Sequence, residues 1–439
     1  MSNKLLDSLQ MDRFLSFGAD SAPVELTNLN VLIGPNGVGK SNLIEAVELL
    51  HATPDDFSEA IRLGGTPRDW IWHGGTGGTT SFSSTSSSSP ASPVASASGG
   101  HASSSSSFST STRRSSARIE AVLSPVNDTP ALRYGIEFAD SAGRLEIADE
   151  VLEDSRKANR RAKDVRFYYR FQRGRPVINV QEVVAGKAAQ RQYRKRKLKR
   201  ESVDPQQSIL SQRKDPDLYP ELTTTAKRLA GIQMFREWSF GRFTALRAAQ
   251  PSNLPTDVLL PQLVNLGLVL NSLEHRDEWA QLNDLMRKFL PRFRRLTTKV
   301  SAGSVQVYLH EEGLGAPVPA TRLSDGTLRF LALLAILLNP ESATLICIEE
   351  PELGLHPDAL SLLADLLVAA SERTQVIVTT HSDVLVSALT EHAESVLVCD
   401  YLENGTELRR LDSAKLARWL EKYRLGEVWR LGKLGGNLW

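Results

Sequence analysis

Residues 29–42 are Leu-Asn-Val-Leu-Ile-Gly-Pro-Asn-Gly-Val-Gly-Lys-Ser-Asn, and residues 34–41 match the pattern G-x-x-x-x-G-K-[ST]. The apolar run at 29–33 predicts a buried strand, and apolar residues recur at helical spacing over 41–52. A glycine-rich loop between a strand and a helix points several backbone N–H groups at phosphate oxygens. Its lysine adds a positive charge, and its serine hydroxyl can bind Mg²⁺. The predicted phosphate-binding residues are Gly34, Pro35, Asn36, Gly37, Val38, Gly39, Lys40, Ser41 and Asn42.

Acidic residues follow a second apolar run, at 345–348, where the sequence continues Glu349-Glu350-Pro-Glu352. Ligands of α/β sheets bind at the carboxyl ends of strands. One carboxylate there can orient Mg²⁺-bound water, and the next can polarise the attacking water. The structural alternative is an acid that caps a strand-to-loop turn. The upstream phosphate loop favours the functional interpretation.

Two further motifs share this pattern of polar residues beside an apolar element. The Leu-Ser-Asp-Gly-Thr motif at 323–327 precedes a long apolar run, so Ser324 and nearby N–H groups can bind phosphate. A plain helix N-cap is the alternative for Ser324. His381 follows an apolar strand predicted at 375–379 and can contact a γ-phosphate. The alternative for His381 is a structural histidine.

Taken in order, these motifs resemble those of an ABC-type ATPase head of the RecF/SMC/OLD-like branch. The segment 348–357, Ile-Glu-Glu-Pro-Glu-Leu-Gly-Leu-His-Pro, resembles the I-E-E-P-E-x-G-L-H-P motif of bacterial AAA/ABC-type ATPases. The opening at 11–17 and the ending at 423–436 are also similar to this group. The motifs lie at both ends of the chain, and the middle matches only loosely.

The resemblance implies an ATPase that uses ATP and Mg²⁺. Lys40 and Ser41 then bind the nucleotide and its metal ion, and Glu349 helps to hold Mg²⁺, although many such heads have the shorter Asp there. Glu350 corresponds to the catalytic glutamate that positions water, and His381 to the γ-phosphate sensor. Lys40, Glu350 and His381 are therefore the expected catalytic residues.

The resemblance also implies a second subunit. Ser324 and Gly326 act in trans on nucleotide held by another head, so a single head with one loop and one signature motif needs a partner. We therefore expect a nucleotide-dependent homodimer with two-fold symmetry. Larger rings occur among similar proteins.

The expected fold is an α/β P-loop NTPase, an ABC-type ATPase head with an antiparallel β subdomain and a largely helical insertion. Residues 79–116 contain 19 serines in 38 positions, which predicts disorder. The expected divisions are an N-terminal head lobe at 1–75, a serine-rich insertion at 76–116, an antiparallel β subdomain at 117–184, a mostly helical insertion with a basic cluster at 185–296, and a C-terminal head lobe at 297–439.

Basic residues gather in one region of a chain that is nearly neutral overall. The chain has 52 Lys and Arg against 51 Asp and Glu, but residues 151–200 contain 17 against 4, a local charge of +13. Such a cluster suits contact with a phosphate backbone. A solvated basic helix or a patch between subunits explains it equally well. The candidate nucleic-acid contacts are Arg191, Arg194, Lys195, Arg196, Lys197, Lys199 and Arg200.

Composition favours a cytoplasmic protein without a membrane span. The longest apolar run, at 330–338, is too short to cross a bilayer, and residues 1–12 have no apolar signal core. Two cysteines, Cys347 and Cys399, cannot form a disulfide framework. Only 58 residues follow His381, so we expect no Toprim nuclease domain of the OLD type in them.

Two functional hypotheses follow. In the first, ATP-driven dimerisation is a switch that controls a separately encoded effector protein, as similar standalone ATPases do in phage-defence and toxin–antitoxin-like systems. In the second, the chain is a RecF-like repair or recombination ATPase that binds DNA through the basic cluster. A nucleotide-binding scaffold without turnover stays open as a third possibility.

Overall fold

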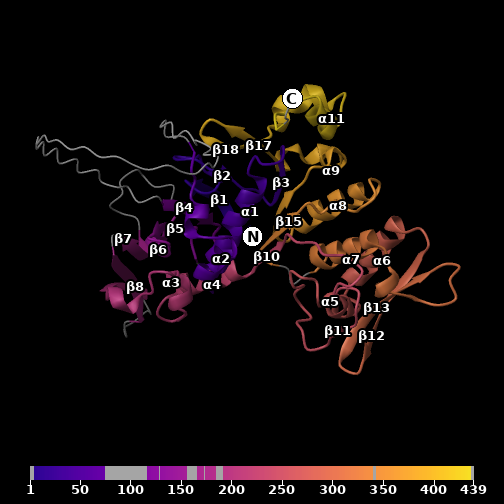
Figure 1. Cartoon of the computed structure of the whole chain (residues 1–439), viewed down its shortest axis with the longest axis horizontal. Coiled ribbons are helices and arrows are strands. Elements are labelled where there is room, and N and C mark those ends of the chain that lie inside the picture. Colours follow the sequence, from indigo (N-terminus) through magenta and orange to yellow (C-terminus); the bar gives the residue numbers. More distant parts are fainter. Residues whose placement is uncertain are drawn as a thin grey trace, which may run out of the picture.

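The structure is a computed structural model that combines a mostly parallel sheet, a long antiparallel sheet and a smaller third sheet (Figure 1). The serine-rich segment expected to be disordered lies almost wholly outside the described residues. The described ranges are 4–74, 116–127, 129–155, 166–172, 174–183, 191–339 and 343–436.

The central six-stranded sheet has the strand order β10-β15-β16-β3-β17-β18. Its first five strands are parallel, and β18 pairs antiparallel with β17. Residues distant in sequence therefore become neighbours at its centre, where β16 lies between β3 and β15. The strands are β3 (Leu29–Ile33), β10 (Ile232–Phe235), β15 (Leu345–Glu349), β16 (Gln375–Thr379), β17 (Val396–Leu402) and β18 (Gly405–Arg410).

Both faces of this sheet are buried, which explains why its strands are continuous apolar runs. Successive side chains point to opposite faces. Val31 and Ile33 thus join one hydrophobic core, while Leu32 between them joins the other. Val376 and Ile377 divide in the same way. The α/β fold expected from the sequence is confirmed.

Helices from the C-terminal half of the chain cover one face of the sheet, and α1 (Lys40–Ala52) with the antiparallel sheet covers the other (Figure 1). The first helix of the C-terminal group, α7, is buried at every residue from Thr327 to Leu337. This explains its almost unbroken apolar sequence. The group comprises α7 (Asp325–Leu337), α8 (Ala359–Ser371), α9 (Asp383–Ala388), α10 (Ser413–Leu420) and α11 (Leu425–Arg430), with the 3₁₀ turn at Thr390–Ser395.

The antiparallel sheet has eight strands in the order β2-β1-β4-β5-β6-β7-β8-β9. Strands β1 and β2 come from the N-terminal segment, so the sheet extends beyond the region expected at 117–184. Strands β7 and β8 form a hairpin, since they pair on either side of Gly174. The strands are β1 (Leu6–Asp12), β2 (Val24–Glu25), β4 (Ser116–Leu123), β5 (Leu132–Ser141), β6 (Arg144–Asp154), β7 (Phe167–Gln172), β8 (Arg175–Val183) and β9 (Arg191–Lys197).

The basic cluster does not form the solvated helix that was one alternative for it, because Arg191–Lys197 in the segment expected to be mostly helical forms the edge strand β9 and pairs with β8. A run of cations has no apolar alternation, so the sequence carries no strand signal there. The partner strand supplies the backbone hydrogen bonds, and exposed cations are common on edge strands. A second strand of the segment expected to be mostly helical, β10, joins the central sheet beside β15.

The rest of that segment contains short helices, followed by a hairpin of the third sheet. In this sheet β13 (Ser304–Glu311) pairs with β12 (Phe293–Ser301), β11 (Gln250–Pro251) and β14 (Val318–Pro319). The helices of that segment are α3 (Ile209–Gln212), α4 (Pro220–Ala230), α5 (Leu266–Leu273) and α6 (Glu278–Phe289), with a 3₁₀ turn at Arg200–Ser202. Outside it lie α2 (Phe57–Leu63) and the 3₁₀ turns at Pro67–Trp70 and Ala320–Arg322. Among the described helices, none has the length and apolar character needed to cross a membrane.

Replacing Phe330 on α7 tests how far the core depends on this helix. Phe330 is fully buried and stacks on Phe289 with ring centroids 4.2 Å apart. We predict that Phe330→Ala lowers the free energy of unfolding by about 3–5 kcal/mol, because it leaves a cavity. Phe243→Ala is the control, since Phe243 is 94% exposed. Urea denaturation measures both, and an equal effect of the two substitutions would contradict the packing described.

Candidate functional site

The candidate site lies at the edge of the sheet where β3, β15 and β16 end. In the register of these parallel strands, Thr379 pairs with both Leu32 and Glu349. The N–H of Glu350 donates to the carbonyl of Thr379 at 3.1 Å, and the N–H of Thr380 donates to that of Leu32 at 3.1 Å. The phosphate loop, the acidic segment and the histidine segment therefore leave the sheet side by side.

Glycines shape the phosphate loop between β3 and α1. Gly37 and Gly39 have φ angles of 80° and 99°, in the left-handed region that side chains disfavour. A Cβ at Gly39 would also lie 2.3 Å from Oγ1 of Thr406 and 2.4 Å from Oγ of Ser16. These two hydroxyls hold the loop from outside, because Thr406 donates to the carbonyl of Val38 at 2.7 Å and its Oγ1 lies 2.6 Å from Oγ of Ser16.

Lys40 fills the interior of the loop. Its Nζ donates to the carbonyls of Gly34 and Pro35, each at 2.8 Å, and the residue is 6% exposed. Burial lowers the pKa of the Lys40 ammonium, although the charges of Glu350 and Glu349 oppose that shift. A buried ammonium whose partners are two carbonyl dipoles can exchange them for phosphate oxygens, which carry full charge.

The start of α1 leaves its N–H groups available to an anion. Gly39 is the N-cap, and no side chain caps the helix. Ser41 is exposed, and Asn42 donates from Nδ2 to Oγ of Ser16 at 2.7 Å. Within the loop itself, Asn36 and Gly37 are exposed and Val38 is buried. The loop thus presents backbone donors and the Ser41 hydroxyl to solvent.

Glu350 has an unusual backbone conformation directly after β15. Its φ angle is 45°, which is rare for a residue other than glycine. Hydrogen bonds fix it, since its N–H is bound by Thr379 and Arg329 donates to its carbonyl at 3.4 Å. Strained residues held by their surroundings are typical of active sites. The conformation turns the carboxylate toward His381, whose Nε2 lies 3.5 Å from Oε1 of Glu350.

His381 is held by the third acid of the segment. Glu352 accepts from the N–H of His381 at 2.8 Å and from the hydroxyl of Thr380 at 2.7 Å. Burial lowers the pKa of His381, and the charge of Lys40 lowers it further. An imidazole with a lowered pKa is neutral at pH 7 and keeps one N–H to donate.

Glu349, the other acid, is paired with an arginine that the sequence did not point to. Arg236 follows β10 and donates from Nε to Glu349 at 3.2 Å and from Nη2 to Glu45 of α1 at 2.7 Å. It also binds Glu48 of α1. Burial acts to lower the pKa of Arg236, but the bond to Glu45 and the nearby carboxylates raise it above its usual value.

An arginine and two aromatic rings connect this region to α7. The guanidinium of Arg329 lies 5.0 Å from the ring centroid of Trp238 and 4.7 Å from that of Phe240, within the range of cation–π contacts. Trp238 also donates from Nε1 to the carbonyl of Glu349 at 2.9 Å. Arg236 and Trp238 were missed because nothing in the sequence showed that 232–235 is a strand ending at this edge. Arg329 lies on α7, where one arginine in an apolar run carries no signal of its partners.

Ser324 and Gly326 occupy the N-terminus of α7. Ser324 accepts from the N–H of Thr327 at 3.1 Å, so within one chain it is an N-cap. A Cβ at Gly326 would lie 2.8 Å from the carbonyl of Gly354, in the segment that follows the acids. Among the described residues, neither Ser324 nor Gly326 forms a hydrogen bond or ion pair with residues 34–42. The structure thus brings Lys40, Glu349, Glu350 and His381 together but not the signature motif.

The residues present suit a magnesium-bound nucleotide. Oε1 of Glu349 is buried and has no hydrogen-bond partner among the described residues, so it can accept from metal-bound water. Carboxylate and hydroxyl oxygens are the ligands that Mg²⁺ prefers.

The candidate nucleic-acid residues lie elsewhere, on β9 and the turn after it at the edge of the antiparallel sheet.

A parallel sheet with a glycine-rich loop after one strand and paired acids after another defines a P-loop NTPase of the ABC-type head class. A family model described as "AAA domain, putative AbiEii toxin, Type IV TA system" matches residues 29–387. The chain belongs to this family.

Individual relatives agree with this assignment. The chain is 33% identical over 126 residues to the Old nuclease of Escherichia phage P2, a match that covers 26% of this chain and 21% of that protein. The chain thus matches only about a fifth of the length of this curated relative.

Solved structures share the fold. An Smc head bound to the C-winged helix domain of ScpA matches with a TM-score of 0.52 and 13% identity, over 94% of this chain and 99% of that one. An Smc head from Pyrococcus furiosus, bound to the C-terminal domain of ScpA, matches with a TM-score of 0.51 and 11% identity, over 95% and 99%.

Titration of His381 tests the electrostatics of the site. We predict a midpoint below the usual 6.5, because burial and Lys40 both disfavour the charged imidazole. Lys40→Met removes one of the two causes and raises the midpoint, while Lys422→Met, at a distant exposed lysine, leaves it unchanged. NMR of ¹³C-labelled histidine measures the titration, and His381→Gln assigns the signal. A midpoint above 6.5, or one insensitive to Lys40, contradicts the geometry.

Proposed function

We propose that this chain binds ATP with Mg²⁺ and hydrolyses it at a site completed by a second head, and that the resulting dimerisation is a switch. The observation that carries the proposal is Glu350. Its carboxylate lies 3.5 Å from His381, in a fixed left-handed conformation, at the same strand edge as the buried Lys40. A site that only stored nucleotide would need neither a strained acid nor a neutral histidine beside it.

The loop residues bind the triphosphate. Backbone N–H groups at the start of α1 and the ammonium of Lys40 contact the phosphate oxygens, with Lys40 exchanging its bonds to the carbonyls of Gly34 and Pro35. Ser41 and Glu349 hold Mg²⁺, directly or through water. When bound, the metal ion neutralises charge on the phosphate oxygens.

Glu350 and His381 have separate roles in hydrolysis. The Glu350 carboxylate accepts a hydrogen bond from the attacking water and so orients it toward the γ-phosphorus. His381 is neutral near pH 7, because its pKa is lowered by burial and by Lys40. Its N–H can therefore donate to a γ-phosphate oxygen while Glu352 holds its backbone in place.

A second copy of the chain completes the site. Within the described residues of one chain, Ser324 and Gly326 form no hydrogen bond with the phosphate loop, although both lie at a helix N-terminus that suits an anion. In a two-fold dimer, each signature motif meets the nucleotide of the partner head. ATP then joins the two heads, and hydrolysis releases them.

The dimer controls a separate effector protein in a phage-defence or toxin–antitoxin-like system in the cytoplasm. Support comes from the family, whose description names a type IV toxin–antitoxin system, and from the matched segment of a phage Old nuclease. The second candidate is a RecF-like DNA ATPase. The observation that favours it is β9, where Arg194, Lys195, Arg196 and Lys197 are all exposed at a sheet edge.

Two substitutions in the site separate binding from hydrolysis. We predict that Lys40→Ala weakens ATP binding roughly 100-fold, because it removes the charge that meets the phosphates. Glu350→Gln keeps ATP binding but lowers kcat by about 10²–10⁴-fold, because the amide cannot serve as the base. Glu391→Gln, at an exposed glutamate away from the site, is the matched control. Unchanged turnover in Glu350→Gln shows that hydrolysis is catalysed elsewhere.

Affinity purification of the Glu350→Gln protein with ATP distinguishes the two biological roles. We predict a stoichiometric protein partner that is absent when Lys40→Ala is also present, because only the ATP-bound dimer holds it. Nuclease-sensitive nucleic acid in its place favours the DNA ATPase. In that case Arg194→Gln with Arg196→Gln abolishes retention, whereas the control pair Arg418→Gln and Lys422→Gln, also exposed, does not.

A further inference from the structure

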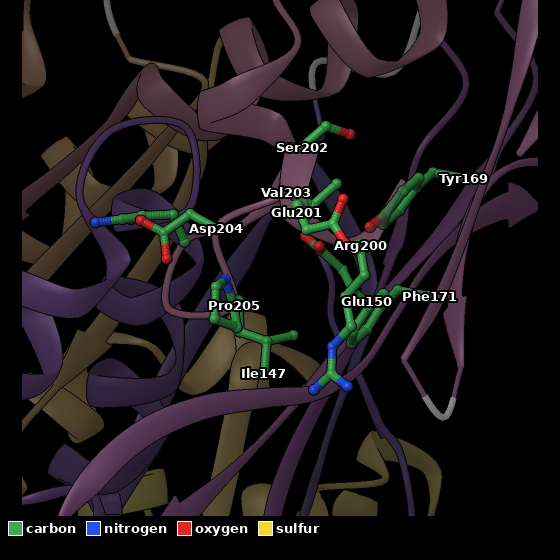
Figure 2. A pocket seen from close by; sticks show the side chains of 11 residues that line it. Ile147, Glu150, Tyr169, Phe171, Arg200, Glu201, Ser202, Val203, Asp204 and Pro205 are labelled. Atoms are coloured by element: carbon green, nitrogen blue, oxygen red, sulfur yellow. The ribbon is translucent and has the colours of Figure 1, made fainter. Parts of the chain in front are cut away.

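A pocket of 570 Å³ lies in the antiparallel sheet region, apart from the residues of the nucleotide site. Strands β6 and β7 form its floor, and the segment after β9, at 200–207, forms its opposite wall (Figure 2). This volume is within the range of small-molecule sites. The lining residues are Ile147, Glu150, Tyr169, Phe171, Arg200, Glu201, Ser202, Val203, Asp204, Pro205 and Gln207.

An irregularity in β6 creates the floor. Residues 147 and 150 would point to opposite faces of a regular strand, because side chains alternate. The register with β5 shifts here, since Glu137 pairs with Asp149 while the next residue, Phe138, pairs with Ile147. Ala148 is therefore an extra residue, a β-bulge, and bulges redirect side chains. Ile147 and Glu150 both line the pocket as a result.

The neighbouring strand adds two aromatic rings to the same face. Phe171 pairs directly with Glu150 across the sheet, and Tyr169 lies two residues along β7. Figure 2 shows the Tyr169 hydroxyl directed toward the other lining side chains. Tyr169 is 1% exposed, and its side chain lines the pocket. A phenol hydroxyl that reaches the pocket can accept a hydrogen bond from a ligand there or donate one to it.

Glu150 is the second buried polar group of the floor. Its Oε1 accepts from Tyr134 at 2.8 Å and from Ser208 at 2.6 Å, and its Oε2 accepts from the N–H of Ile209 at 3.0 Å. These bonds attach the start of α3 to the sheet. A carboxylate oxygen has two lone pairs, so Oε2 has capacity for another donor. Glu150 therefore fixes the wall of the pocket and can also contact its contents.

The charge of the lining is negative. Three carboxylates line the pocket, from Glu150, Glu201 and Asp204, against one cation, Arg200. Arg200 itself lies 3.7 Å from Glu146 outside the lining, which offsets its charge. The rest of the wall is apolar, with Ile147, Val203 and Pro205 beside the two rings. An anion is therefore disfavoured, and a cation with an apolar body meets complementary groups at both ends.

We propose that this pocket binds a small organic cation with a flat apolar body, such as an aryl amidine or aryl amine. Its charged N–H groups donate to Oε2 of Glu150 and to the Tyr169 hydroxyl, and its body packs against Phe171 and Val203. Aromatic rings and a buried carboxylate together recognise organic cations in many proteins. The site is independent of ATP binding, so it can be tested on the protein without nucleotide.

Calorimetric titration with benzamidine tests the proposal, with benzamide and benzoate as neutral and anionic analogues of the same shape. We predict a Kd for benzamidine on the order of 0.1–1 mM at pH 8, since a ligand of few atoms has limited affinity. Benzamide binds at least about tenfold more weakly, because it lacks the charge that pairs with Glu150. Benzoate does not bind.

Two variants show whether the pocket is the site. Tyr169→Phe removes only the hydroxyl and weakens benzamidine binding about 3- to 10-fold without affecting the fold. Glu150→Gln weakens it by more than about tenfold. Glu150→Gln also loses the hydrogen bond from the N–H of Ile209, so circular dichroism checks whether this variant is folded. If Glu150→Gln unfolds, Tyr169→Phe still tests the proposal. Glu312→Gln, at an exposed glutamate outside the lining, is the matched control.

The pH dependence gives a readout that a structural role of Glu150 would not produce. Burial raises the pKa of Glu150 to about 7. The cation binds the ionised carboxylate, so its affinity falls about tenfold from pH 8 to pH 6 and binding at pH 6 releases a proton. The ionisable and charged groups that face Glu150 are Tyr134 on β5, Asp149 on its own strand, Tyr169 on β7, and Arg200, Glu201 and Asp204 on the opposite wall.

Each contrary result overturns the assignment. The titration uses 5 mM benzamidine, roughly five times the weakest expected Kd. If it releases or absorbs no heat of binding, the pocket is not an aryl cation site. Benzamide or benzoate binding as tightly as benzamidine shows that charge is not recognised. Binding that neither variant weakens places the ligand outside the pocket.

Discussion

The parallel register of three strands is the constraint on which the site depends. Because β16 is hydrogen-bonded between β3 and β15, the residues that follow all three strands emerge at one edge of the sheet. Lys40, Glu350 and His381 are far apart in sequence, yet each follows one of these strands within a few residues. A one-residue slip of β16 would place Thr379 one position away from Leu32 and Glu349 and separate the histidine from the carboxylate. The positions of Lys40, Glu350 and His381 relative to one another therefore depend on the pairing of the three strands.

A guanidinium stabilises the same edge from the side. Arg236 contacts three carboxylates, two on α1 and one at the end of β15, so it joins the helix after the phosphate loop to the strand that carries the acids. Without it, Glu45, Glu48 and Glu349 would repel one another in a partly buried space. The cation thus holds the Glu349 carboxylate in place. Arg236 also connects the site to β10, which precedes it closely in sequence, and to Trp238, which follows it closely. This part of the chain is distant in sequence from the phosphate loop, yet it belongs to the head.

Local sequence motifs made several strands and helices around the candidate site predictable. The strand at 29–33, the helix after it and the strand at 375–379 follow from apolar runs beside glycine, acid or histidine, and the structure has them at nearly the same bounds. Long-range pairing was not predictable. β9 is a run of cations that becomes a strand only because β8 pairs with it, and β10 is four residues long. Arg236 was missed with β10, and the pocket beside Glu150 depends on a bulge that no residue pattern marks.

We propose that each nucleotide site uses two chains, and a mixed dimer tests this proposal most directly. A dimer of one Lys40→Ala chain and one Ser324→Arg chain, purified through two different tags, has one site with both defects and one with neither. Two-fold symmetry then predicts about half of the wild-type ATPase activity per dimer, although each variant alone is inactive. Activity in the mixed dimer no higher than in the separate variants would show that the signature motif and the phosphate loop do not meet across an interface.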